Sequence, residues 1–257
     1  MRIMTSNIWG DYFGNPVDVR IDDIYEVYKN YDPDILGFQE ITKRWYDSGL
    51  FERLSDEYDF VATEIFGSNN FVPFAFKKSF KLISKGYEYL DETPDVTKGI
   101  SWAVLKGEED KVFAVCNTHF WWMTGPEHDE IRVKNAEQLT YVMKSLNNRY
   151  ACPVFAFGDM NSVLASDIFT VYAENGINHL YDLAEVKDNV SSHHGDPKKA
   201  EDGTFHGEKT SNDKSCSIDH MIALGDGFHI SQYRIVEDKK ALDATDHSPV
   251  FVDVTLD

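Results

Sequence analysis

The chain has 257 residues, of which 42% are hydrophobic and 27% are charged, and its 44 acidic and 25 basic residues give a net charge of −19. This composition is typical of a folded globular protein and excludes collagen-like, coiled-coil and disordered chains. The negative charge repels phosphate backbones, which disfavours a sequence-independent grip on duplex DNA and favours a small substrate, or one met through metal ions.

The sequence predicts a single domain over residues 1–257. No linker rich in Pro, Gly or Ser divides it, and no apolar run approaches the about 20 residues of a membrane-spanning helix. The segment Met1–Asn7 lacks the apolar stretch of a signal peptide, so we expect a cytoplasmic protein. The sequence leaves the oligomeric state open. Three cysteines without CxxC spacing are expected to be reduced, mostly buried thiols: Cys116, Cys152 and Cys216.

The first part of the chain predicts a strand, a helix and a second strand. Arg2–Ile8 alternates in polarity as a strand does, starting almost at the first residue. Val17–Tyr31 carries apolar residues at helical spacing, and Pro33 marks its end. Asp34–Glu40 is a short apolar run that closes in polar residues. This order predicts a sheet with helices on its face.

Strands outnumber long helices in the rest of the chain. A second long helix is predicted over Ile131–Leu146. The segment Lys187–Ser217 is polar and has little periodicity, which is typical of a surface excursion, although loops of this length often border a site. Further strands are predicted at Phe60–Ala62, Phe74–Phe76, Ser101–Lys106, Val112–Asn117, Val154–Gly158, Ile218–Ala223 and Val250–Thr255.

Clusters of Asn, Asp, Glu and His lie at the ends of several predicted strands. Each cluster alone is typical of a turn or a cap. If the strand ends converge, they assemble carboxylates, amides and imidazoles with no cysteine among them, and oxygen-rich ligands suit Mg²⁺ or Mn²⁺. A histidine beside a carboxylate moves or stabilises protons near neutral pH. The clusters contain Asn7, Gln39-Glu40, Asn117–His119, Asp159–Asn161, Asp219-His220 and Asp246-His247.

Taken in order, these motifs resemble the endonuclease/exonuclease/phosphatase superfamily, which has the DNase I-like fold. The resemblance implies an α/β (α+β) chain folded as a four-layer sandwich, with two mixed β-sheets packed face to face and helices on the outer faces. It also implies a phosphoesterase that depends on Mg²⁺ or Mn²⁺. The resemblance extends from Arg2 to Val254 and rests on Thr5–Trp9, Gly37–Glu40, Asn117–Phe120, Gly158–Ser162, Ser217–His220 and Thr245–Pro249.

The resemblance implies roles around a metal ion and an attacking water. Glu40 resembles the metal-binding glutamate, Asn7 the asparagine beside it, and Asp246 a second carboxylate on the metal side. Asp159 and Asn161 resemble the pair that orients or deprotonates the water and holds the phosphoryl group.

The resemblance also implies two histidines with different tasks. His247 resembles the catalytic histidine and Asp219 the aspartate that fixes its ring, while His119 resembles the histidine that contacts phosphate or protonates the leaving oxygen. Many relatives carry a glutamate that supports this first histidine or a metal. At that place the chain has Ser68–Asn70, where Asn70 adds no charge, and Glu64 is a candidate substitute.

Three residues near the second helix are candidate substrate contacts. Trp121 and Trp122 follow His119 and either wall a pocket, stacking on a base or sugar, or pack in the core. Arg132 resembles an arginine that relatives place at the start of this helix. It either reaches a phosphate or forms a surface ion pair with Glu127 or Glu130.

The polar segment contributes one more candidate. His206 lies in Gly203–Gly207, which resembles a turn near the active-site rim of relatives, and it is a candidate substrate contact. His193 and His194 are expected to be exposed to solvent.

Three functions compete for this sequence. The favoured function is metal-dependent hydrolysis of a small phosphodiester or phosphomonoester. A nuclease for single-stranded or damaged nucleic acid is the alternative, and it predicts a basic stripe along the cleft for which Lys77–Lys85 and Lys198-Lys199 are the candidates. A catalytically silent binding module of the same fold predicts the loss of motif positions, yet the principal positions are all present.

Overall fold

The computed structural model describes residues 1–63, 71–94 and 96–257, and two large mixed sheets form its centre. The seven-stranded sheet has the order β10 (Val186–Lys187), β14 (Phe228–Ile235), β15 (Val250–Leu256), β1 (Arg2–Asn7), β2 (Ile35–Gln39), β4 (Phe74–Lys77) and β3 (Tyr58–Val61). The six-stranded sheet has the order β5 (Lys81–Tyr89), β6 (Gly99–Lys106), β7 (Val112–His119), β8 (Val154–Asp159), β13 (Asp219–Leu224) and β9 (Ile177–His179).

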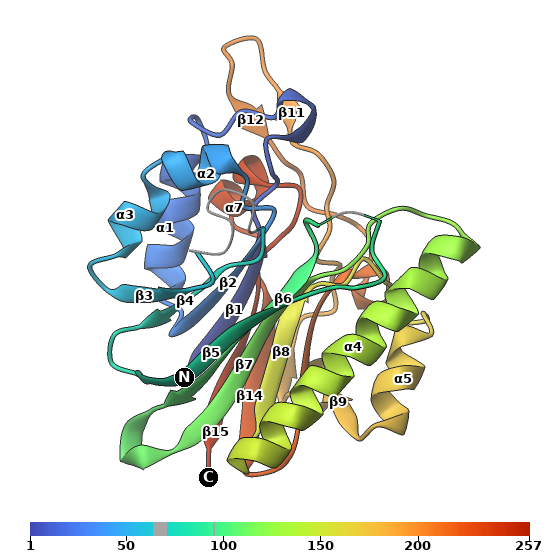
Figure 1. Cartoon of the computed structure of the whole chain (residues 1–257). Helices are drawn as coiled ribbons and strands as arrows, with labels where there is room; N and C mark the ends of the chain where they lie inside the picture. The colour runs from blue at the N-terminus through green and yellow to red at the C-terminus, as the bar shows by residue number, and fades with distance from the viewer. Residues whose placement is uncertain (64–70, 95) are drawn as a thin grey trace.

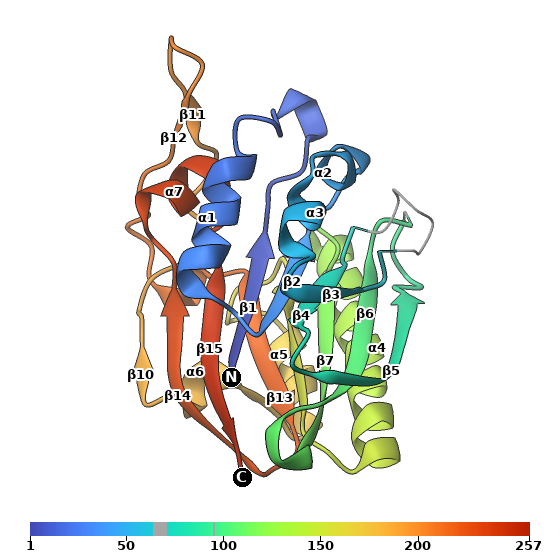
Figure 2. The same ribbon diagram turned by 90° about the vertical axis from the view of Figure 1, so that its left-hand side faces the viewer.

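Helices cover the outer face of each sheet, which completes the predicted four-layer sandwich (Figures 1 and 2). The seven-stranded sheet is covered by α1 (Ile21–Tyr31), α2 (Lys43–Asp47), α3 (Leu50–Leu54) and α7 (Lys239–Ala244). The six-stranded sheet is covered by α4 (Pro126–Tyr150) and α5 (Ile168–Glu174), and the short α6 (Leu180–Leu183) contacts β9, β13 and β14. No helix among the described residues combines the length and apolar character needed to cross a membrane.

Alternation along the central strands builds the layers. In β8, Phe155 and Phe157 belong to the apolar core between the two sheets, whereas Val154 and Ala156 belong to the core under α4, which includes Leu139. Successive side chains of a strand point to opposite faces, so a strand covered on both sides needs apolar residues at every position. This requirement explains why the buried strands appear in the sequence as continuous apolar runs.

Two glycines let the backbones approach closely near one end of the strands. A Cβ on Gly37 of β2 would lie 2.3 Å from the Phe157 ring across the sheets. Gly158 of β8 has φ +146°, and a Cβ there would lie 1.9 Å from the carbonyl oxygen of Thr118 on β7. The close approach of the sheets allows Gln39 Nε2 to donate a hydrogen bond to Asn117 Oδ1 at 2.6 Å.

The structure adds elements that the sequence patterns do not predict. The strands β5 and β14 and the helix α5 are the longer additional elements, and shorter ones are α2, α3, α6, α7, β9 and β10. The helix α4 runs beyond Ile131–Leu146 at both ends, and α1 begins at Ile21 instead of Val17. Every residue of β5 is exposed or half-buried, so the strand lacks the apolar run of the central strands. The polar segment Lys187–Ser217 contains a hairpin, β11 (Lys198–Lys199) and β12 (Phe205–His206), which projects from the molecule (Figure 1).

Candidate active site

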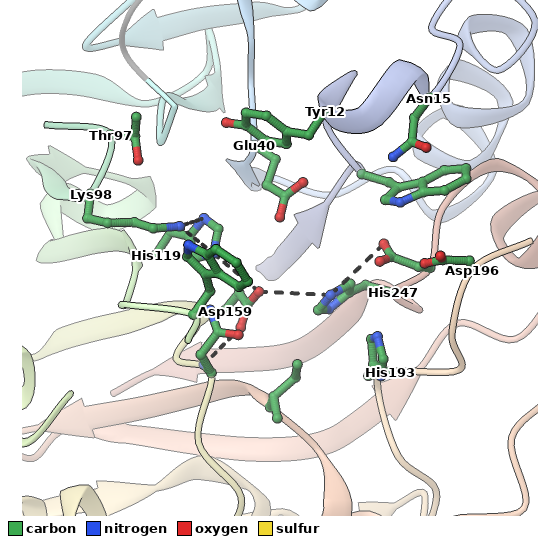
Figure 3. A pocket seen from close by; sticks show the side chains of 15 residues that line it. Tyr12, Asn15, Glu40, Thr97, Lys98, His119, Asp159, His193, Asp196 and His247 are labelled. Atoms are coloured by element: carbon green, nitrogen blue, oxygen red, sulfur yellow. Dashed lines mark hydrogen bonds and ion pairs between the residues drawn. The ribbon is translucent and has the colours of Figure 1, made fainter. Parts of the chain in front are cut away.

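Strand register brings the candidate residues to one end of the sandwich. The neighbouring strands β7, β8 and β13 pair His119 with Asp159 and Asp159 with Asp219. In the other sheet, β1 and β2 pair Asn7 with Gln39, so that Glu40 follows directly. A cavity of about 650 Å³ opens here, and Glu40, His119 and Asp159 line it (Figure 3).

Asn7 connects the carboxylates of the two sheets. Its Nδ2 donates to Glu40 Oε1 at 3.2 Å and to Asp159 Oδ2 at 3.0 Å, while its Oδ1 accepts from the backbone N–H of Trp9 at 3.0 Å. The backbone N–H of Gly10 donates to Glu40 Oε2 at 2.7 Å. Asn7 therefore hydrogen-bonds to both Glu40 and Asp159 and fixes the orientation of these two carboxylates.

His247 and Asp219 form a buried ion pair. His247 Nδ1 lies 2.8 Å from Asp219 Oδ2, which also accepts from Ser192 Oγ at 2.7 Å. Burial alone would lower the pKa of His247, but Asp219 and Asp246 outweigh it, and the pKa is raised well above 6.5. Burial would likewise raise the pKa of Asp219, but His247 outweighs it and the pKa is lowered. These carboxylates favour the imidazolium form of the ring, whose Nε2 lies 3.9 Å from Asp159 Oδ2.

His119 has the opposite electrostatic environment. Lys98, which directly precedes β6, has its Nζ 3.0 Å from Nε2 and 3.1 Å from Nδ1 of His119. Burial lowers the pKa of His119 well below 6.5, and the positive charges of Lys98 and His247 lower it further. This environment favours the neutral imidazole form of His119, whose Nε2 lies 3.5 Å from Asp159 Oδ2. Lys98 is absent from the candidates that the sequence predicts, because a single lysine before a strand has no distinguishing pattern.

The carboxylates of the cavity are crowded and buried. Burial raises the pKa of Asp159 to about 7, and the Asp219 charge contributes to the rise. Burial also raises the pKa of Asp246 to about 6, with Glu40 contributing. Asn161, with a left-handed φ of 47°, donates its backbone N–H to Asp159 Oδ1 at 2.9 Å. A bound cation would relieve this crowding of negative charge.

The donor set fits a hard divalent cation. Glu40, His119 and Asp159 offer ligand atoms within 4.8 Å of one another. Carboxylate oxygens predominate at the Glu40 side, and no cysteine is among the described residues that line the cavity. This chemistry suits Mg²⁺ or Mn²⁺ better than a structural zinc ion.

Of the three substrate contacts predicted near α4, only Trp122 lines the cavity, whereas Trp121 and Arg132 do not. Trp122 lines the cavity and is 54% exposed. Trp121 is buried outside the cavity lining, and its Nε1 donates to His128 Nδ1 at 2.9 Å. Arg132 is also buried: it donates to the carbonyl oxygen of Trp121 at 3.1 Å and forms an ion pair with Asp129. Arg132 therefore braces the loop before α4, and its partner is neither of the two glutamates that the sequence suggests.

The histidines of the polar segment lie differently from the expectation. His193 and His194 are half-buried, so the expectation of solvent exposure is wrong. His193 lines the cavity, and its ring packs edge-on against that of His247 with centroids 4.8 Å apart. His206 lies exposed on the hairpin, 3.8 Å from Asp243, outside the cavity lining. The positions Ser68–Asn70 and Glu64 lie outside the described residues.

Two packed mixed sheets that carry acidic and histidine side chains at one end define the architecture of DNase I-like phosphoesterases. The chain belongs to the endonuclease/exonuclease/phosphatase family, whose model matches residues 4–247, and this confirms the resemblance. Members of this family are phosphoester hydrolases that depend on divalent cations. No curated protein matches the chain.

Solved structures of the same fold cover the whole chain at low sequence identity. An endonuclease/exonuclease/phosphatase from Bacteroides vulgatus is 22% identical, with a TM-score of 0.79 and 98% of its own chain covered. A mannosyl-6-phosphatase from Bacteroides thetaiotaomicron is 20% identical, with a TM-score of 0.77 and 100% covered. The human nocturnin catalytic domain is 16% identical, with a TM-score of 0.75 and 94% covered. At these identities the likeness shows the fold.

Proposed function

We propose that the chain is a Mg²⁺- or Mn²⁺-dependent hydrolase of a small phosphoester, either a phosphomonoester or a small phosphodiester. The arrangement around Asp159 carries this proposal. This buried carboxylate lies between the neutral His119 and the charged His247, at the floor of a cavity that Glu40 and Asp246 also line. Such a cavity offers a proton acceptor, a cationic donor and oxygen ligands for a cation within the reach of one phosphate group.

Each side chain has a task in this proposal. Asp159, held by Asn161 and Asn7, accepts a proton from the attacking water. The imidazolium of His247, fixed by Asp219, donates to a phosphate oxygen and offsets the negative charge of the transition state.

Glu40 and Asp246 would hold the divalent cation, with Asn7 beside them. Asn7 fixes the orientation of Glu40 through its Nδ2. When bound, such a cation neutralises phosphate charge and stabilises a leaving oxyanion.

The volume of the cavity and the net charge of the chain both support a small substrate. The cavity of about 650 Å³ suits one phosphorylated sugar or nucleotide better than a polymer, and its aromatic lining of Trp9, Tyr12 and Trp122 suits the face of a ring. One structural neighbour is a mannosyl-6-phosphatase. The net charge of −19 argues in the same direction.

Two of the basic residues considered for a nuclease, Lys77 and Lys81, lie at the ends of their strands that are remote from the cavity. Strand β4 runs antiparallel to β2, so Lys77 at its end lies beside the start of β2 and remote from Glu40. Lys81 pairs with Lys106, at the end of β6 that is remote from Lys98. These lysines give no support to a basic stripe along the cavity.

A panel of phosphoesters tests the proposed function. We expect sugar, nucleotide or aryl phosphates to be hydrolysed with Mg²⁺ or Mn²⁺, EDTA to abolish the activity, and added cation to restore it. Glu40→Gln should lower kcat/KM by roughly 100-fold or more because it removes a charged ligand. Glu127→Gln, an exposed acid outside the cavity, is the matched control and should have no effect.

Two results would contradict the proposal. Hydrolysis that is indifferent to both EDTA and added cation would refute the metal dependence. Activity confined to single-stranded or abasic DNA would favour the nuclease.

A further inference from the structure

Lys98 is a buried cation in the wall of the cavity. Lys98 is only 6% exposed, and it lines the cavity from the position just before β6. Figure 3 shows Lys98 and His119 on one side of Asp159 and His247 on the other side. A charge this deeply buried is costly unless it faces charged or polar groups.

The contact between Lys98 and His119 determines which of the two carries the positive charge. Lys98 Nζ lies 3.0 Å from Nε2 and 3.1 Å from Nδ1 of His119, so the ammonium group and the ring are in direct contact. Two positive charges in contact repel each other, which favours the state in which only one of the two groups is charged. Lysine is a much stronger base than histidine, so the positive charge on this side of the cavity lies on Lys98.

The two cationic groups face a common space. His247 Nε2 lies 3.9 Å and His119 Nε2 lies 3.5 Å from the same oxygen, Oδ2 of Asp159. Lys98 Nζ lies 3.0 Å from His119 Nε2, and Lys98 lines the same cavity. A phosphate group above Asp159 would therefore have the His247 donor on one flank and the Lys98 ammonium on the other.

We propose that Lys98 binds a terminal oxygen of the substrate phosphate and makes the cavity selective for phosphomonoesters, with His119 as the residue that positions its ammonium. This inference rests on the phosphoesterase function proposed above. A monoester is largely a dianion with three terminal oxygens at neutral pH, whereas a diester is a monoanion with two. A second cation on the far flank therefore stabilises the monoester more than the diester.

A matched pair of substrates tests the selectivity: an aryl phosphate and its methyl diester, which release the same phenol. Lys98→Met should lower kcat/KM for the monoester by roughly 10- to 100-fold, the range for losing one charge-assisted hydrogen bond, and that for the diester several-fold less. Lys98→Arg keeps the charge and should retain much of the selectivity, even if Lys98→Met folds poorly. Lys106→Met, at the other end of β6, is the matched control and should behave as the wild type.

Binding of inorganic phosphate provides a readout that does not depend on turnover. By calorimetry in the presence of Mg²⁺, Lys98→Met should bind phosphate roughly 10-fold more weakly than the wild type and the Lys106→Met control.

The outcomes separate this inference from the proposed function. If the wild type hydrolyses neither aryl ester with any cation, the proposed function fails, while the phosphate titration still tests Lys98. If the wild type is active and Lys98→Met lowers kcat/KM for both esters by the same factor, or for neither, then Lys98 does not select monoesters. Unchanged phosphate binding in Lys98→Met would also refute the contact.

Discussion

The pKa values of two histidines in one cavity are shifted in opposite directions, and their immediate neighbours explain the difference. Burial disfavours the imidazolium form of both rings, but Asp219 and Asp246 outweigh it at His247, whereas Lys98 adds to it at His119. Pairs of titratable groups whose surroundings separate their pKa values are a common way to assign acid and base tasks. Here the separation arises from carboxylates on one flank of Asp159 and an ammonium group on the other.

Asp219→Asn tests this assignment of charge. The amide preserves the shape of Asp219 but removes the charge that raises the pKa of His247, so a smaller fraction of the ring is protonated at neutral pH. We expect kcat/KM to fall roughly 100- to 10,000-fold. Asp226→Asn, an exposed site just after β13, is the control. Wild-type turnover in Asp219→Asn would show that His247 needs no charged partner.

The cavity residues that the sequence predicts all lie in or beside motifs at strand ends. The cavity residues that it does not predict lack such a motif. Asp159, Asp219 and His247 stand next to apolar runs, and this shared position groups them from the sequence alone. His193 lies in an aperiodic segment, and it reaches the cavity because it forms an isolated antiparallel bridge with His247. Long-range pairing of this kind has no local sequence signal.

At the level of elements, burial decides which strands the sequence predicts. Strand β8 is buried at all of its positions and is predicted nearly to its last residue. Strands β5 and β14 are partly exposed, with mixed polar and apolar residues, and their patterns are too weak to distinguish from loops. The register that joins His119, Asp159 and Asp219 depends on the central, well-predicted strands.

Gly158→Ala tests how tightly that register is fixed. A methyl group at this position would overlap the Thr118 backbone, and φ of +146° is a conformation that alanine rarely adopts. We expect a loss of roughly 2–4 kcal/mol in the free energy of unfolding, measured by urea denaturation. Gly176→Ala, at φ +71° with no atom within 4 Å of the added Cβ, isolates backbone strain and should cost about 1 kcal/mol. Equal losses in the two variants would show that the β7–β8 approach tolerates a side chain.

At the level of the whole molecule, a buried polar network lies next to the strands whose ends line the cavity. His179 Nε2 lies 3.2 Å from His220 Nδ1, and His220 Nε2 lies 2.7 Å from the carbonyl oxygen of Ser162. Burial lowers the pKa of His179 to about 3, with Lys214 contributing. The folded state therefore holds His179 neutral in a range where the unfolded chain protonates it.

This difference predicts acid sensitivity of the fold. Between pH about 6.5 and about 3 the unfolded state binds a proton at His179 that the folded state excludes, so stability is lost as the pH falls. The contribution approaches ~1.4 kcal/mol per pH unit. His179→Gln should reduce the slope of unfolding free energy against pH by up to this amount, whereas Asn178→Gln, exposed on the same strand, should not. An unchanged slope in His179→Gln would contradict the assignment.

The position of β1 has a consequence for biosynthesis. This strand pairs with β2 on one side and with β15 on the other, where Arg2 lies opposite Asp253. A ribosome adds about 5–20 residues per second, so the earliest strand waits roughly 10–50 s for its later neighbour to emerge. During that interval its hydrogen-bonding edge is open to other nascent chains, and a chaperone that shields extended segments should raise the yield of native protein.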